Sequence, residues 1–149
     1  MARYCETMLG CSEYILKIFT IASPHKGAPL LKHSIVLKTF NTKRHKQMVP
    51  GSEFLCDGEF TVKCKDKYLT YGSVHDIHVP DSYTRLEDVP HEVISGCCHI
   101  GIMSSDMLWR SIIKHLEDLN ATAKRTEENK TVQADRVQAE KVLKAEKLE

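Results

Sequence analysis

The residues best suited to chemistry lie at Cys97-Cys98-His99 and at His75-x-x-His78. Cysteine sulfur and histidine nitrogen are ligands that Zn²⁺ prefers, and a structural zinc site needs four of them arranged as a tetrahedron. A cysteine can also be a nucleophile when a nearby base takes its proton. Cys98 has His75 and His91 as candidate bases in the sequence. These residues therefore raise the hypothesis of a metal or thiol site.

The expected backbone argues against both kinds of site. The run from Val93 to Met103 is apolar, short and interrupted by glycine, which favours a buried strand. Successive side chains on a strand point to opposite faces, so the adjacent cysteines cannot easily serve one ion. The sequence contains no G-x-S-x-G, no phosphate-binding loop and no H-E-x-x-H. We therefore expect no metal, no cofactor and no enzymatic activity, and we expect Cys97, Cys98 and His99 to belong mainly to the core.

An amphipathic helix is predicted directly after this run. Ser104, Ser105 and Asp106 suit a helix N-terminus, because a hydroxyl can accept a bond from a free amide and a carboxylate favours the positive end of the dipole. Apolar residues then recur at helical spacing, at Leu108, Trp109, Ile112, Ile113, Leu116 and Leu119. From residue 120 onward there is no Gly or Pro, which predicts a charged, solvated helical tail that either continues this helix or follows it. Its apolar residues keep no sustained coiled-coil seam.

The fold class predicted from these patterns is α+β. Five further segments favour strands: Tyr14–Ile21, Ser34–Phe40, Glu59–Lys65, Tyr68–Tyr71 and Val74–Val79. The connections between the last of them look short, and short connections favour antiparallel pairing. We therefore expect a small antiparallel sheet packed on one main amphipathic helix. Residues 1–119 would form a single domain and residues 120–149 the charged tail.

The cysteines and the N-terminus suggest a compartment. Six cysteines could form a disulfide framework in a secreted chain, but the first residues do not show the pattern of an export signal. Free thiols in a reducing environment are then the expectation. No apolar run approaches the length that a membrane-spanning helix needs. We therefore expect an intracellular protein, cytoplasmic and with an association to a membrane surface or a virion.

The charge is uneven and points to an anionic partner. Residues 1–50 hold eight Lys or Arg and two Asp or Glu, although the whole chain has a net charge of +1. The cationic loop around residue 44 ends in an apolar tip, which would suit a membrane interface. Three lysines on the outer face of the strand Glu59–Lys65 and just after it would suit RNA phosphates. The candidate anion-binding residues are Lys38, Lys43, Arg44, Lys46, Met48, Val49, Lys63, Lys65 and Lys67.

The order of three stretches, YILKIFTI, TKRHKQMVP and DMLWRSIIKHL, gives the chain its layout. Over about residues 14–119 this layout resembles the compact matrix proteins of negative-strand RNA viruses, particularly those of the rhabdovirus type. The resemblance implies a non-enzymatic assembly protein that links an anionic membrane to nucleoprotein and associates with itself. Two alternatives remain open. One is a small RNA-binding regulator of the silencing-suppressor kind, and the other is a domain with a thiol or metal site at residues 97–99.

Overall fold

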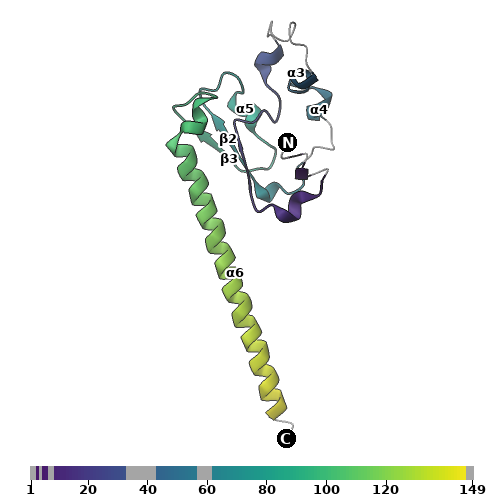
Figure 1. Cartoon of the computed structure of the whole chain (residues 1–149), viewed down its shortest axis with the longest axis vertical. Coiled ribbons are helices and arrows are strands. Elements are labelled where there is room, and N and C mark those ends of the chain that lie inside the picture. Colours follow the sequence, from purple (N-terminus) through teal and green to yellow (C-terminus); the bar gives the residue numbers. More distant parts are fainter. Residues whose placement is uncertain (1–2, 4, 7–8, 33–42, 57–61, 147–149) are drawn as a thin grey trace. The chain divides into compact units, whose positions relative to one another are not determined.

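The computed structural model describes the chain except for residues 1–2, 4, 7–8, 33–42, 57–61 and 147–149. It is of the α+β class, with one small sheet and one long helix (Figure 1). The chain divides into two compact units, which comprise residues 1–108 and residues 109–149.

The sheet in the first unit has three strands, which are β1 (Ile18–Ile21), β2 (Tyr68–Ser73) and β3 (His91–Ile94). Their order is β1-β2-β3, and both neighbouring pairs are parallel. Every residue of the central strand β2 is buried. Such burial is expected of a parallel strand that is covered on both faces.

The predicted antiparallel sheet is therefore wrong, and the cause lies after β2. We expected Val74–Val79 to be another strand, but these residues form turns and bends. From there the chain passes through the short helix α5 (Asp81–Thr84) before β3 begins at His91. A connection of roughly a dozen residues or more can return the chain in the same direction, whereas a tight hairpin cannot.

Other expected strands are shorter than predicted or fall elsewhere. The strand expected at Tyr14–Ile21 is confirmed only for its second half, because η1 (Cys11–Tyr14) is a 3₁₀-helix. The strand expected at Tyr68–Tyr71 is confirmed within β2. β3 ends at Ile94, so most of the apolar run from Val93 to Met103 is loop and 3₁₀-helix.

The segment Ser34–Phe40 lies outside the described residues, as do residues 59–61 of the expected strand Glu59–Lys65. The described part of that segment, residues 62–65, is not a strand, so the prediction is wrong there. The remaining short elements are η2 (Pro29–Lys32), α3 (Lys43–Gln47), α4 (Glu53–Cys56), η4 (Lys65–Lys67) and η5 (Gly101–Ser104).

A buried carboxylate ties the N-terminal segment to the core. The side chain of Glu6 accepts hydrogen bonds from the backbone amides of Lys63 and Cys64 and from the Tyr68 hydroxyl, which is 2.8 Å from Oε2. Burial, together with the bond to Glu6, raises the pKa of Tyr68. Tyr68 itself packs with Val62 and Val89 in the hydrophobic core. Satisfying each polar group allows this segment to be buried at low cost.

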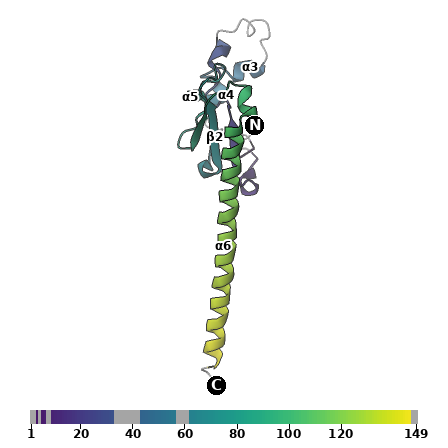
Figure 2. The same cartoon turned by 90° about the vertical axis from the view of Figure 1, so that its left-hand side faces the viewer.

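The long helix α6 (Asp106–Glu146) begins where the capping residues predicted. Figures 1 and 2 show it as one continuous helix, with no break at residue 120. Leu108 is completely buried, while Trp109, Ile113 and Leu116 are exposed. Among the described residues, no helix is long and apolar enough to cross a membrane.

Candidate functional site

Two loops at one edge of the sheet bring Asp76 and His99 together. Asp76 follows the end of β2 and His99 follows the end of β3. Neighbouring parallel strands end at the same edge of a sheet, and this edge is where open α/β sheets commonly bind ligands. Nδ1 of His99 lies 2.6 Å from Oδ2 of Asp76.

The backbone fixes the carboxylate of Asp76. Its Oδ1 accepts the backbone amides of His78 at 2.9 Å and Val79 at 2.8 Å. A short Asp side chain bonded to amides two and three residues ahead is a common stabiliser of turns. The side chain is fully buried, at 0% exposure. Oδ2 is thus left in one position, where it can orient a single partner.

His99 is held at one nitrogen and open at the other. A carboxylate can only accept, so the bond to Asp76 favours the tautomer with the proton on Nδ1 and leaves Nε2 as a base. Among the described residues, Nε2 has no hydrogen-bond partner. The side chain is 35% exposed. The His78 ring lies beside it, with a distance of 5.5 Å between the ring centroids.

Hydrogen bonds also hold the loop that carries His99. The Ser73 hydroxyl, at the end of β2, donates to the carbonyl of Cys97. The amide of Ile102 donates to the Cys98 carbonyl at 3.0 Å, at the start of η5. Gly96 has a φ of 74°, a conformation that glycine adopts at little cost. The loop is therefore attached to the central strand on one side and to η5 on the other.

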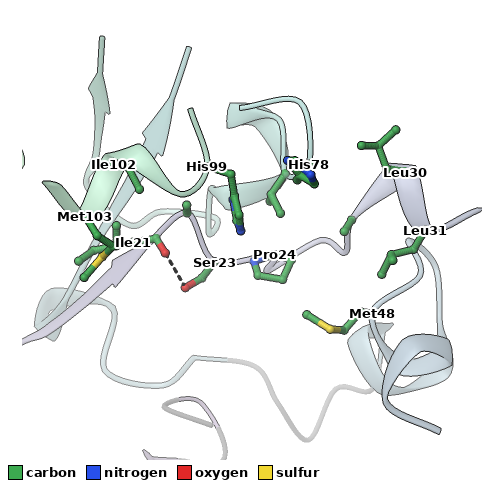
Figure 3. A pocket seen from close by; sticks show the side chains of 13 residues that line it. Ile21, Ser23, Pro24, Leu30, Leu31, Met48, His78, His99, Ile102 and Met103 are labelled. Carbon is green, nitrogen blue, oxygen red and sulfur yellow. Dashed lines mark hydrogen bonds between the residues drawn. The ribbon is translucent and has the colours of Figure 1, made fainter. Parts of the chain in front are cut away.

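His99 lines a cavity of about 510 Å³ (Figure 3). In the view of Figure 3, its ring lies between Ile102 and Met103 on one side and Leu30 and Leu31 on the other. Apart from Ser23, His78 and His99, the lining residues are apolar: Ile21, Ala22, Pro24, Ala28, Leu30, Leu31, Met48, Val79, Ile102 and Met103. The arrangement is an imidazole base, backed by a buried carboxylate, at the wall of an apolar cavity.

A second Asp–His pair, formed by Asp81 and His91, differs from the first because it leaves no ring nitrogen of the histidine free. Nε2 of His91 is 2.6 Å from Oδ1 of Asp81, and Nδ1 is 2.7 Å from the Thr70 hydroxyl. Both ring nitrogens are therefore occupied, and the His91 side chain is only 7% exposed. Burial tends to raise the pKa of Asp81, but hydrogen bonds from His91 and Arg85 outweigh it and lower the pKa. This pair joins β2, β3 and α5 and has no free base to offer.

The cysteines of the hypothesised thiol site do not converge on His99. Cys98 is exposed, and the backbone amides of Gly101 and Ile100 lower the pKa of its thiol. Cys97 instead lies beside the Ser73 hydroxyl, with a distance of 3.5 Å between Sγ and Oγ. In the part of the chain that the structure describes, no group of three or more His, Cys, Asp or Glu could hold a metal ion.

The predicted basic loop is partly helical. Lys43, Arg44 and Lys46 belong to α3, where Lys43 and Lys46 are exposed. Met48 and Val49 follow directly, and Met48 lines the same cavity as His99. Lys38 lies outside the described residues.

The predicted lysine stripe does not form on a strand at its described end. Lys65 and Lys67 lie in η4, a 3₁₀-helix, and Lys63 is exposed just before it. Nζ of Lys65 is 2.8 Å from the Asp88 carboxylate, and Nζ of Lys67 donates to the Ser12 carbonyl. Two of the three lysines therefore have partners within the protein.

Sequence reasoning assigned His99 to the core and passed over Asp76. The assumed strand Val74–Val79 placed Asp76 within a strand, where it carried no special meaning. One signal was available in the sequence, because a lone Asp between a predicted strand and Pro80 is typical of a turn. A histidine after the next strand would then have been its natural partner.

Comparison with known proteins found no matching family model, no similar curated protein and no similar solved structure.

Proposed function

We propose that this chain carries the acid–base pair of a hydrolase, with His99 as the base and Asp76 as the carboxylate that orients it. One observation carries the proposal: a fully buried carboxylate holds Nδ1 of an imidazole whose Nε2 is left free beside a cavity. In Ser-His-Asp enzymes, a buried aspartate holds Nδ1–H in the same way while Nε2 takes the nucleophile's proton. The chain order of carboxylate and then histidine is also that of α/β-hydrolases.

The free Nε2 of His99 allows this residue to transfer protons during the reaction. Nε2 of His99 takes a proton from an attacking hydroxyl, and the Asp76 carboxylate stabilises the imidazolium that forms. His99 then returns the proton to the leaving group as the bond between that group and the acyl carbon breaks, so that it acts first as a base and next as an acid. Where the attacking hydroxyl belongs to the protein, the acyl group is now bonded to it. His99 then takes a proton from a water molecule that attacks the acyl carbon, and returns the proton to the protein hydroxyl as the acid is released.

Of the described residues that line the cavity, Ser23 is the one that carries a hydroxyl group. Its Oγ donates to the Ile21 carbonyl at a long distance of 3.3 Å, which is a weak bond to break. Ser23 is therefore a candidate nucleophile. A water molecule acting as the nucleophile would use the same nitrogen of His99.

The assembly function expected from the chain's layout stays a prediction, as do RNA binding and self-association. Such functions would use the exposed lysines of α3, and nothing in them requires a buried carboxylate to orient an imidazole. Acid–base catalysis gives both residues a direct role, and we favour it for that reason.

Hydrolysis of p-nitrophenyl butyrate by the whole chain tests the proposal. His99→Gln should lower kcat by about 10²–10⁴-fold, the usual contribution of general acid–base catalysis. His75→Gln is the matched control, because His75 is exposed in the same loop as Asp76 and does not line the cavity. Equal activity in the wild type and His99→Gln would refute the proposal.

The nucleophile is identified separately with a fluorophosphonate probe and mass spectrometry. An adduct on Ser23 that is lost in Ser23→Ala identifies Ser23 as the nucleophile. Esterase activity that depends on His99 but survives in Ser23→Ala, with no adduct on Ser23, indicates a water molecule or another hydroxyl.

A further inference from the structure

We infer that the cavity beside His99 holds the aliphatic chain of an acyl ester. This inference rests on the proposed function and adds a substrate class to it. The observation behind it is the composition of the cavity wall, which presents a base and a hydroxyl within an otherwise apolar lining.

The lining selects against charged and strongly polar substrates. Among the described residues that line the cavity there is no Lys, Arg, Asp or Glu. A charged group placed there would lose its water and gain no partner of opposite charge. Sugars and peptides would lose hydrogen bonds to water that this wall cannot replace. A hydrocarbon chain loses nothing of that kind and gains from burial.

The volume and the side chains suit a chain rather than a small acetyl group. A cavity of about 510 Å³ lies within the range of pockets that bind small molecules and is far larger than an acetyl group needs. Met48 and Met103 line it and are 41% and 50% exposed, so their side chains have room to move. Methionine is unbranched and flexible, and it adapts to ligands of different length.

The cavity wall carries polar side chains as well as apolar ones. Ser23 and His99 line the same cavity as Leu30 and Leu31. An acyl chain lying against the two leucines would therefore place its carbonyl group in the same cavity as the hydroxyl and the imidazole. His78, whose ring lies beside His99, also lines the cavity.

The test is a chain-length series of p-nitrophenyl acetate, butyrate, hexanoate and octanoate. Each methylene that enters the cavity should raise kcat/KM by about fourfold, which corresponds to about 0.8 kcal/mol per buried CH₂. Leu31→Trp narrows the cavity and should move the best substrate toward shorter chains. Leu16→Trp is the matched control, because Leu16 is 86% exposed and does not line the cavity. Melting curves of both variants show that they are folded.

Calorimetric titration with sodium octanoate and sodium butanoate separates this inference from the proposed function. The titration uses His99→Gln, which lacks the base but keeps the apolar wall, and octanoate should bind more tightly than butanoate. Octanoate binding without hydrolysis of any ester supports the cavity assignment and overturns the proposed function. Hydrolysis that depends on His99 but not on chain length, together with no octanoate binding, overturns the inference and leaves the function standing.

Discussion

Replacing Asp76 by Asn or by Ala should separate its effect on stability from its effect on His99. The carboxylate accepts three hydrogen bonds, from the amides of His78 and Val79 and from the His99 ring. Asn keeps one oxygen for the two amides and replaces the other with an NH₂ group. Ala removes all three acceptor contacts.

The two variants should lose very different amounts of stability. Hydrogen bonds to a charged group contribute about 1.5–3 kcal/mol each, and leaving buried donors unpaired adds a cost. Asp76→Ala should therefore lower the free energy of unfolding by about 3–5 kcal/mol, since the three bonds are not fully additive. Asp76→Asn retains the two backbone bonds and should lower it by only about 1–2 kcal/mol.

The loss of activity in Asp76→Asn should be large, although its loss of stability is small. In Asp76→Asn the new NH₂ group is a donor that faces Nδ1 of His99, so the imidazole would have to move its proton to Nε2. Nε2 would then no longer be a base. In a Ser-His-Asp enzyme the same change lowers kcat by about 10⁴-fold, and we expect a loss of about 10³-fold or more.

Urea denaturation gives the free energies, and p-nitrophenyl butyrate hydrolysis gives kcat. Asp81→Asn is the matched control, because it makes the same chemical change in the pair with His91, which does not line the cavity. It should reduce stability and leave kcat within a few-fold of wild type. If Asp76→Asn kept full activity, or if both substitutions lowered kcat equally, the tautomer argument would be refuted.

Two further predictions concern the sheet and its surroundings. Gly72→Ala should lower the free energy of unfolding, measured in urea, by about 1–3 kcal/mol. The added methyl group would clash with Oδ1 of Asp81 and lie 2.7 Å from the Thr84 hydroxyl. Unchanged stability would show that α5 moves freely. Burial, and then the charge of Arg3, lowers the pKa of His25 from 6.5 to about 4. The unfolded chain then binds this proton more readily, so stability should fall as the pH drops from 6.5 to 4 and level off below it, with a total loss of about 3 kcal/mol. His25→Gln should flatten that part of the pH–stability curve, and an unchanged slope would exclude His25 as its cause.

Local patterns were sufficient where neighbouring residues decide the structure. The start of α6 at Asp106 was predictable, because capping depends on a few residues at a helix end. The strand at Tyr68–Tyr71 was predictable, because β-branched and aromatic residues favour extended backbone. The turn after Ser73 was not recognised, because the β-branched residues of Val74–Val79 also suit a strand.

That one error changed the expected topology and hid the site. With a strand at Val74–Val79 the connections looked tight, and tight connections favour antiparallel pairing. With a turn there, β2 and β3 run parallel and their following loops meet at one edge. The separation of Asp76 from His99 along the sequence says nothing of the 2.6 Å between their side chains.

The sequence by itself determined the α+β class, the start of the long helix and the helical character of the tail, because propensity and capping act over a few residues. The structure decided that the tail continues the long helix. The tertiary structure alone decided the direction of the strands and which histidine has a free nitrogen. His91 and His99 each lie at or after β3 and each pairs with an aspartate. Only packing decides that the first has both nitrogens bonded in a buried position, whereas the second presents a base to a cavity.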